Sequence, residues 1–404
     1  MCEKSLALYY EIKDEKLRKR RKEILTVMQL LPELNSGGVE RGTLEMARYL
    51  VKNKHKSIVV SGGGRLVDQL EKGGTKHIER TIGSKSPVAL IHILPLRRLM
   101  KQGVDILHLR SRMPAWIAYV AWLSLPPSRR PVLLTTFHGF YSVNAYSAVM
   151  TKGDGVIAVS DSIKQHIADN YSRVGNVKLI FRGVEASSFD PRMVSRARVE
   201  KLMQRWGIKG NSPVLMLPGR LTRLKGQEYF LQSLLRVHDN NFQAVLVGDT
   251  EENSAYTLEL KEFIEKNNLR DKVRLVGHCS DMPAAFLVAD IVISASSLEP
   301  EAFGRTTVEA MAMGCPVIVT AHGGSLETVI PGENGWLVKP SDPDDLARAI
   351  DEALSMDSNF LREIGRNNRE RVTKNFTAKA MCDQTLAFYN DLLKLRLSTV
   401  KNNR

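Results

Sequence analysis

The amino-acid sequence predicts an α/β fold of two domains, each built on a parallel β-sheet with helices on both faces. A chain of 404 residues exceeds what one compact core of ordinary size accounts for. Hydrophobic residues make up 43% of the chain and charged residues 25%, which is typical of a soluble globular protein. Short apolar runs alternate with helical patterns along the chain, and this alternation favours parallel sheets covered by helices.

The first half alternates strands and helices in a regular order. Apolar runs predict strands at 24–31, 57–61, 106–109, 132–136 and 155–160, and helical patterns fill 39–52, 66–72, 115–125 and 161–171. Ligands of parallel sheets bind beyond the carboxyl ends of the strands. The polar turns at 35–38 and 138–139 fall at such ends.

The second half repeats this alternation after a turn-rich passage at 183–191. Strands are expected at 214–217, 244–247, 273–276, 291–294 and 317–320, with helices between them, one of them through 228–237. A final helix is expected at 378–395. The second half therefore predicts a second sheet of the same kind.

One string in the second half joins a loop, a helix and a strand. The strand at 291–294 runs out into a polar loop that carries Glu301, and Gly304 opens the next turn. The helix is expected at 306–313, which puts Glu309 in its second turn and Glu301 ahead of its N-terminus.

This arrangement suits a phosphate with a sugar on either side. Backbone N–H groups of Phe303, Gly304 and the residues after them lie at the positive end of the helix dipole. Glu301 and Glu309 can then hold sugar hydroxyls on both sides of the phosphate. The plainer alternative is two exposed acids near a helix start, where Glu is common.

The same string resembles the donor-site signature of the family 4 retaining glycosyltransferases. The segments Arg112–Trp116 and Thr136–Gly139 resemble those of bacterial members that build lipopolysaccharide core or related envelope glycans. The match covers Glu301 and Glu309 with seven residues between them, Phe303-Gly304, and the run from Glu309 to Ile318. The resemblance extends over most of the chain and implies the GT-B fold, two Rossmann-like domains with parallel sheets facing across a cleft. It divides the chain into a basic N-terminal extension at 1–22, an acceptor-side domain at 23–188, a nucleotide-sugar-binding domain at 189–375 and a C-terminal helix at 376–404 that crosses back.

Arg220 and Lys225 form the second motif, at the junction between a strand and the next helix. Arg offers a rigid fork and Lys a mobile point charge to phosphate oxygens. Both match family positions, so the resemblance implies that they neutralise a nucleoside diphosphate leaving group without a metal. A solvated surface loop is the alternative, and Arg223 is expected to point outward.

The resemblance also assigns roles in the first half. Gly37 and Gly38 are expected to face the diphosphate and the acceptor, with an ordinary turn as the alternative. His138 is expected to bond the hydroxymethyl group of the transferred sugar, although a lone His is often structural. Arg182 stands where many relatives carry Asn, so the hydrogen bond expected there is in doubt.

The expected site residues fall into two sets. The catalytic set is Glu301, His138, Lys225 and Arg220, and the donor-binding set is Gly37, Gly38, Arg220, Lys225, Phe303, Gly304 and Glu309. No metal ligands are expected, because the chain has no Asp-x-Asp beside a strand end. The implied co-substrate is a nucleotide-diphosphate sugar, UDP-sugar first, and no further cofactor is expected.

Charge is divided unevenly along the chain. Residues 1–195 hold 31 Lys and Arg against 17 Asp and Glu, a net +14, whereas residues 196–404 hold 27 of each. The run at 16–22 and the pairs Arg97-Arg98 and Arg129-Arg130 contribute to the excess. A basic half favours an anionic partner, and phospholipid or a phosphorylated glycolipid fits better than nucleic acid, because the basic residues are not interleaved with aromatic ones. A solvated basic surface is the alternative.

The expected location is the cytoplasmic face of the inner membrane, with peripheral attachment. The four cysteines have no paired spacing, which favours thiols in a reducing compartment. The longest apolar stretch, at 115–125, is too short to span a bilayer as a helix, and no signal peptide is expected.

The sequence therefore predicts a retaining glycosyltransferase that acts on a glycan or glycolipid acceptor of lipopolysaccharide or envelope polysaccharide biosynthesis. A non-catalytic nucleotide-sugar-binding subunit on the same fold is the alternative.

Overall fold

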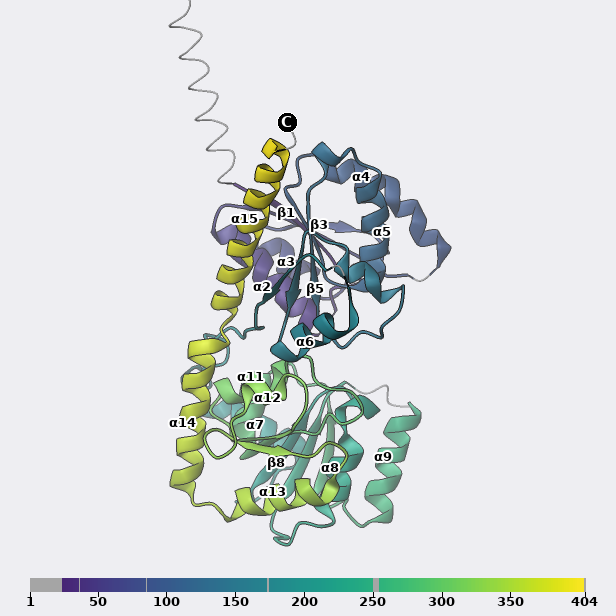
Figure 1. The fold of residues 1–404 in the computed structure, drawn as a ribbon. Coiled ribbons are helices and arrows are strands. Elements are labelled where there is room, and N and C mark those ends of the chain that lie inside the picture. The colour runs from purple at the N-terminus through teal and green to yellow at the C-terminus, as the bar shows by residue number, and fades with distance from the viewer. Residues whose placement is uncertain (1–23, 36, 85, 173, 250–253, 403–404) are drawn as a thin grey trace, which may run out of the picture. The chain divides into compact units, whose positions relative to one another are not determined.

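The computed structural model describes residues 24–35, 37–84, 86–172, 174–249 and 254–402 (Figure 1). The chain forms two compact units. The first comprises the described parts of Met1–Ala158, His166–Ile180 and Cys382–Arg404, and the second comprises those of Val159–Gln165 and Phe181–Met381. The expected extension at 1–22, with its basic run at 16–22, lies outside the described residues.

Seven described strands of the first unit form one parallel sheet in the order β3-β2-β1-β4-β5-β6-β7. The strands are β1 (Thr26–Leu30), β2 (Lys56–Ser61), β3 (Lys76–Glu79), β4 (Ile106–Leu109), β5 (Val132–Phe137), β6 (Gly155–Ala158) and β7 (Asn176–Leu179). The α-helices are α2 (Gly38–Lys52), α3 (Val67–Lys72), α4 (Ile93–Met100), α5 (Arg112–Leu123) and α6 (Asp161–Asn170). The sequence did not predict β3 and β7, because these edge strands are short and lack a buried run.

The second unit holds a parallel sheet in the order β10-β9-β8-β11-β12-β13. The strands are β8 (Val214–Pro218), β9 (Gln243–Val247), β10 (Val273–Gly277), β11 (Ile291–Ser294), β12 (Val317–Thr320) and β13 (Trp336–Val338). The α-helices are α7 (Arg196–Trp206), α8 (Gln227–Leu234), α9 (Ala255–Lys266), α10 (Met282–Val288), α11 (Arg305–Ala312), α12 (Ser325–Thr328), α13 (Pro343–Ser355) and α14 (Ser358–Asn375). The expected class, two Rossmann-like domains with parallel sheets, is confirmed.

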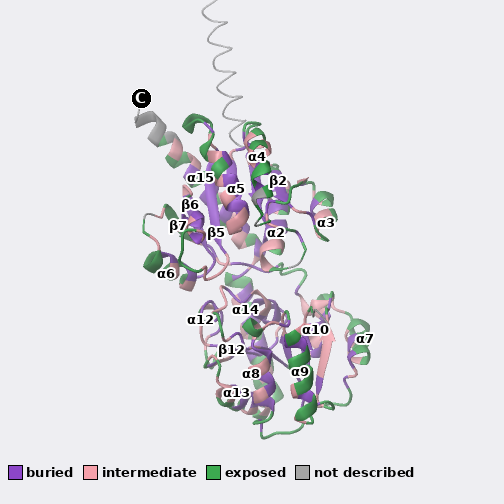
Figure 2. Ribbon diagram, turned by 90° about the vertical axis from the view of Figure 1, so that its right-hand side faces the viewer, coloured by how far each residue is buried: buried purple, intermediate pink, exposed green. Residues whose placement is uncertain are grey.

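The cores of both units lie along the central strands. Every residue of β4, β5 and β12 is buried, since helices cover both faces of a parallel sheet. Figure 2 shows this burial in purple, with exposed residues on the outer sides of helices such as α9. Continuous apolar runs of this kind are the reason the central strands could be predicted from the sequence.

Both sheets have a point where the strand order reverses. In the first unit it lies between β1 and β4, and in the second unit between β8 and β11. The loops that follow these strands diverge to opposite sides and leave room for a ligand at the carboxyl edge. Candidate site residues are therefore expected after β1, β4, β8 and β11.

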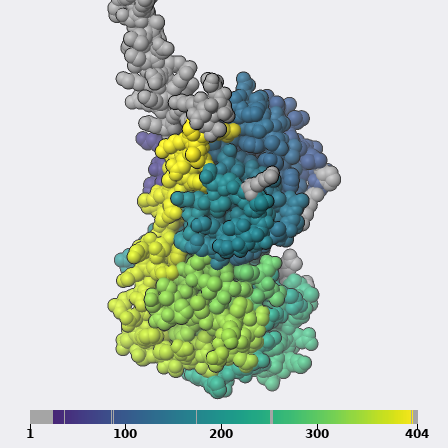
Figure 3. Space-filling view, viewed as in Figure 1, coloured from purple at the N-terminus to yellow at the C-terminus, as the bar shows by residue number. Residues whose placement is uncertain are grey.

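The C-terminal helix α15 (Ala378–Asn402) contributes to the core of the first unit from Cys382 onward, and it lies along the surface of that unit in yellow in Figure 3. The Tyr389 hydroxyl lies 2.7 Å from Nδ1 of His108, and Nε2 of the same ring lies 2.6 Å from the Thr136 hydroxyl. Burial, with the Arg110 guanidinium nearby, holds the pKa of His108 well below its ordinary value. A neutral ring thus joins α15 to β4 and β5.

Two expectations about composition can be compared with the structure. Cys279, Cys315 and Cys382 are present as buried thiols. Among the described helices, none is both long enough and apolar enough to cross a membrane.

Candidate active site

The loops that follow β8 and β11 carry the strongest candidate site of the second unit. β8 and β11 are parallel neighbours at the point where the strand order reverses. The 3-10 turn η5 (Arg223–Lys225) after β8 ends at Lys225, and the loop after β11 leads through Glu301 to α11. The Lys225 ammonium and the Glu301 carboxylate form an ion pair. Two side chains 76 residues apart therefore meet where parallel sheets bind their ligands.

Gly226 allows these two loops to come so close. Its φ is +71°, and a Cβ at this position would lie 1.9 Å from the carbonyl oxygen of Ala295. On the other side, a Cβ on Gly248 after β9 would lie 1.9 Å from the carbonyl oxygen of Gly219. The loop after β8 thus packs against the ends of both neighbouring strands, at distances that only glycine permits.

The groups around Glu301 keep its carboxylate ionised, so that it acts as a hydrogen-bond acceptor. The Ser296 hydroxyl donates to Glu301 Oε1 at 2.8 Å, the same oxygen that pairs with Lys225. Burial alone would raise the pKa of this carboxyl, but the Lys225 charge, hydrogen bonds from Lys225 and Ser296, and His322 hold that pKa below its ordinary value. Glu301 is therefore ionised at neutral pH, with a second carboxylate oxygen to offer to a ligand.

The turn after β12 supports the loop that carries Glu301. The Gly324 N–H donates to the Glu301 carbonyl oxygen at 2.7 Å. A Cβ on Gly323, whose φ is +61°, would lie 2.3 Å from that same oxygen. His322 Nε2 and the Thr320 hydroxyl each lie 2.6 Å from the carbonyl oxygen of Ser296. The two loops are thus tied by backbone as well as by side chains.

Helix α11 begins directly after this loop. Gly304 is its N-cap in the left-handed conformation, with φ of +78°. The first N–H groups of a helix have no partner within it and carry the positive end of its dipole. Phe303 is buried, and its ring centre lies 5.6 Å from that of Phe376 and 6.3 Å from that of Phe181. This aromatic cluster fixes the direction in which α11 starts.

Glu309 lies in the second turn of α11, where the sequence places it. Its Oε1 accepts a hydrogen bond from Arg305 Nε at 2.9 Å, and the two side chains are only 6% and 11% exposed. Arg305 was not among the expected site residues, although its spacing of four from Glu309 on a helix was a readable signal. The ion pair fixes the carboxylate orientation at the helix surface.

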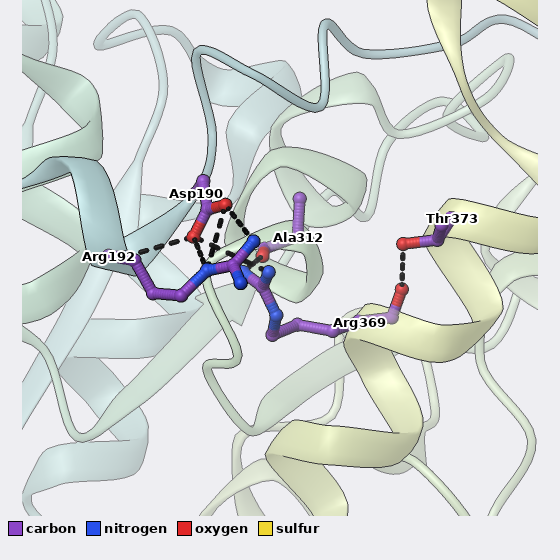
Figure 4. A network of polar contacts seen from close by, with 5 residues as sticks. All are labelled: Asp190, Arg192, Ala312, Arg369 and Thr373. Atoms are coloured by element: carbon purple, nitrogen blue, oxygen red, sulfur yellow. Dashed lines mark hydrogen bonds and ion pairs between the residues drawn. The ribbon is translucent and has the colours of Figure 1, made fainter.

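The other end of α11 is held by the network in Figure 4. Arg369 on α14 donates to the carbonyl oxygen of Ala312, the last residue of α11, at 2.7 Å. The same guanidinium lies 3.5 Å from Asp190, which Arg192 also binds. Hydrogen bonds from Arg192 lower the pKa of Asp190 to about 2. The network satisfies a carbonyl that the helix leaves open and fixes α11 against α14.

Arg220 and Arg223 differ in surroundings, although they share one loop. The Arg220 side chain is exposed, and its carbonyl oxygen accepts from Gln227 Nε2 at 2.9 Å. Arg223 pairs with Glu228 at 3.4 Å and Glu259 at 2.5 Å. Arg223 is thus engaged with α8 and α9, which agrees with an outward-pointing side chain, and Arg220 is a further exposed cation of this loop.

The expected residues of the first unit follow its strands. Gly37 is the N-cap of α2 with φ of +142°, and Gly38 is the first residue of that helix. His138 directly follows β5, and its N–H donates to the Tyr141 hydroxyl at 3.4 Å. Arg110, which follows β4, is a buried cation that sequence reasoning did not select, and its Nε donates to Gln29 Oε1 at 2.9 Å.

Two further observations concern Arg182 and possible metal ligands. Arg182 is buried in the second unit. Within the part of the chain that the structure describes, no group of three or more His, Cys, Asp or Glu side chains could hold a metal ion.

Comparison with known proteins places the chain in a family. The description "Glycosyltransferase Family 4" matches residues 36–188, and "Glycosyl transferases group 1" matches residues 198–371. A crystal structure of a glycosyltransferase from Rickettsia africae is 36% identical, with a TM-score of 0.83, over 92% of this chain and 99% of that protein.

Two more distant proteins cover the chain nearly as fully. Alr3699/HepE of Anabaena, crystallised in complex with UDP and glucose, is 22% identical, with a TM-score of 0.80, over 91% of this chain and 99% of its own. The capsular polysaccharide biosynthesis glycosyltransferase CapM of Staphylococcus aureus is 25% identical over 389 residues, which is 92% of this chain and 97% of CapM. The architecture, the site and these matches agree: the chain belongs to the family 4 glycosyltransferases of the GT-B fold, enzymes that use nucleotide-sugar donors.

Proposed function

We propose that this glycosyltransferase transfers a sugar, with retention of configuration, from a UDP-sugar to a hydroxyl of a glycan or glycolipid acceptor. The observation that carries the proposal is the ion pair between Lys225 and Glu301 at the strand-order reversal, directly ahead of the N-terminus of α11. UDP-glucose is the first donor to test, because the Anabaena protein of the same fold was crystallised with UDP and glucose.

In the proposed reaction, the bond between the anomeric carbon and the phosphate oxygen breaks as the acceptor oxygen bonds to the same face of that carbon. The acceptor proton passes to the departing phosphate oxygen. Arg220, Lys225 and the N–H groups at the start of α11, with those of Phe303 and Gly304, stabilise the charge that develops on the diphosphate. Glu301 orients the donor sugar through its hydroxyls, since it offers an ionised carboxylate beside Lys225.

The remaining candidate residues take positioning roles. Glu309 accepts hydrogen bonds from the ribose hydroxyls, and Arg305 holds its carboxylate in place. Gly37 and Gly38 let the backbone approach the diphosphate closely. His138 bonds the hydroxymethyl group of the transferred sugar, and its carbonyl oxygen faces the anomeric carbon.

The reaction as proposed needs no metal ion. Two cationic side chains and a helix N-terminus neutralise the diphosphate, which is the task that a divalent cation performs in other glycosyltransferases. EDTA should therefore leave turnover unchanged.

The acceptor is proposed to be a lipopolysaccharide or another envelope glycan, and the enzyme to work at the cytoplasmic face of the membrane as a peripheral protein. The similarity to a capsular polysaccharide glycosyltransferase supports the acceptor class. The excess positive charge of residues 1–195 supports attachment to an anionic surface.

The test is a screen of sugar nucleotides for turnover and for thermal stabilisation of the protein. Arg220→Ala should lower kcat/KM about a hundredfold, because removing one aimed charge costs on the order of 3 kcal/mol. Arg223→Ala is the matched control from the same loop and should keep its activity, since Arg223 pairs with Glu228 and Glu259. Stabilisation by a sugar nucleotide without any turnover, with or without acceptors, would instead indicate a binding subunit.

A further inference from the structure

An apolar face lies exposed at one side of the first unit. The 3-10 helix η1 (Pro87–His92) runs directly into α4, and four large hydrophobic side chains of this segment are more than half exposed. Val88 is 64% exposed, Leu90 55%, Ile91 64% and Leu94 62%. Single exposed hydrophobic side chains are ordinary, but four within seven residues form a cluster that needs an explanation.

The helical spacing places these side chains on one surface. Val88, Ile91 and Leu94 follow one another at intervals of three, which one face of a 3-10 turn and the next α-turn share. The opposite side of the same segment, with Ala89 and Leu96, is buried.

Helix α5 packs along α4, as Figure 1 also shows, and adds two more exposed side chains from its C-terminal half: Val120 and Leu123. We name the six residues Val88, Leu90, Ile91, Leu94, Val120 and Leu123 the α4 face.

Cations border the α4 face. Arg97 Nε lies 3.4 Å from the carbonyl oxygen of Ser124, and Arg130 donates to the carbonyl oxygen of Leu123 at 2.8 Å. Both arginines are thus fixed at the C-terminal end of α5. Arg98 and Lys101, at the end of α4, are exposed.

The surrounding sequence contains almost no acid. From residue 80 to residue 153 the chain holds ten Lys and Arg but a single acidic residue, Asp105. The Asp105 carboxylate is half-buried and accepts the N–H of Thr26 at 2.8 Å, so it is engaged within the unit. An exposed apolar patch with a cationic border, in a segment that holds a single engaged acid, matches the interface of a bilayer that contains anionic lipid.

We propose that the α4 face docks on an anionic membrane, with Ile91 and Leu94 inserted at the boundary between headgroups and acyl chains and with Arg97, Arg98, Lys101 and Arg130 on the headgroup phosphates. This inference deepens the membrane location proposed above and rests on it. It differs from attachment by charge alone in one measurable way. Salt screens the cations but leaves apolar insertion intact, so part of the binding must survive high salt.

The experiment is sedimentation of the full chain with phosphatidylcholine vesicles, with and without phosphatidylglycerol, at low and high salt. The wild type should bind the anionic vesicles and remain partly bound at high salt. Ile91→Asp with Leu94→Asp should weaken binding about a hundredfold, because each large apolar side chain kept out of the bilayer costs on the order of a tenfold loss. Met193→Asp with Leu258→Asp, two exposed apolar residues of the second unit, is the matched control and should bind as the wild type does.

A second pair of variants tests the cations that border the α4 face. Arg98→Glu with Lys101→Glu should weaken low-salt binding at least twentyfold, since each cation near an anionic surface contributes about fivefold. Lys261→Glu with Lys266→Glu on α9, exposed in the second unit, makes the same charge change away from the α4 face and should have little effect.

Several results would overturn the proposal. They are wild-type binding to neither kind of vesicle, complete release of the wild type by salt, or equal binding by the Ile91 and Leu94 variant. A lipid-free dimer that this variant abolishes would assign the α4 face to a second copy of the chain. None of these readouts uses catalysis, and the variants should turn over the donor with soluble acceptors normally. Vesicle binding by an inactive protein would contradict the proposed function and leave this inference standing.

Discussion

The close approach of Gly226 to Ala295 gives the sharpest test of how the site is assembled. Gly226→Ala adds a methyl group 1.9 Å from the carbonyl oxygen of Ala295, whereas ordinary contact begins at 3.4 Å. The two loops must therefore separate by about 1.5 Å. Lys225 precedes Gly226 directly, so this separation moves its ammonium away from Glu301.

The expected loss is large in activity and moderate in stability. A displacement of about 1 Å in a catalytic group can cost about a hundredfold in rate, so kcat/KM should fall by at least that factor. The left-handed φ of +71° adds a strain of about 1–2 kcal/mol for alanine, beside the cost of the clash. Release of nucleotide from the sugar nucleotide measures the first effect, and urea unfolding measures the second.

Gly210→Ala is the matched control. Gly210 has nearly the same φ, +68°, but a Cβ there meets nothing within 4 Å. It should lose only the strain of about 1–2 kcal/mol and keep wild-type kcat/KM. Equal activity of the two alanine variants would refute the claim that the glycine contact holds Lys225 beside Glu301.

Three further predictions address charge, the nucleotide and the first unit. In Lys225→Ala, Glu301 keeps only Ser296 and His322 to offset its burial, so the pKa of Glu301 rises. The acid limb of the pH profile of kcat/KM should then move to higher pH, and an unmoved limb would contradict the assignment. In the wild type, the lowered pKa of Glu301 stabilises the folded protein at pH values above the pKa that Glu301 has in the unfolded chain. This stability is lost as the pH falls through the pKa of Glu301 in the folded protein. Glu309→Gln should weaken UDP binding about tenfold in calorimetry, and unchanged affinity would remove Glu309 from the ribose site. Tyr389→Phe leaves the buried His108 without its 2.7 Å partner and should cost about 1–3 kcal/mol in urea unfolding, whereas a smaller loss would mean that α15 is held by packing alone.

The sequence predicts the central strands well because their apolar runs are buried on both faces. β4, β11 and β12 have the predicted bounds, and α11 differs from its expected range by one residue at each end. The edge strands β3, β7 and β13 have only short or partly buried runs, so they could not be distinguished from loops. Helix α4 was not predicted either, because it is only eight residues long and contains Pro95.

The sequence predicts which residues belong to the candidate site, but it does not predict which of them are in contact. A motif indicates that Lys225 and Glu301 both serve the donor, yet their pairing follows from the adjacency of β8 and β11, which is a property of the sheet order. Gly226 likewise reads as an ordinary turn glycine until the Ala295 carbonyl is found beside it. Arg305 could have been found from its spacing to Glu309, since side chains four apart on a helix are neighbours.

The proposed reaction is retaining transfer from a nucleotide sugar at the site around Lys225 and Glu301. The measurement that tests it most directly is a proton NMR time course of UDP-glucose turnover that identifies the anomer formed first. The wild type should release α-glucose or an α-linked product first, and Lys225→Ala with Glu301→Ala should be slowed at least a hundredfold. An initial β-anomer, or an unchanged rate in the double variant, would contradict the account.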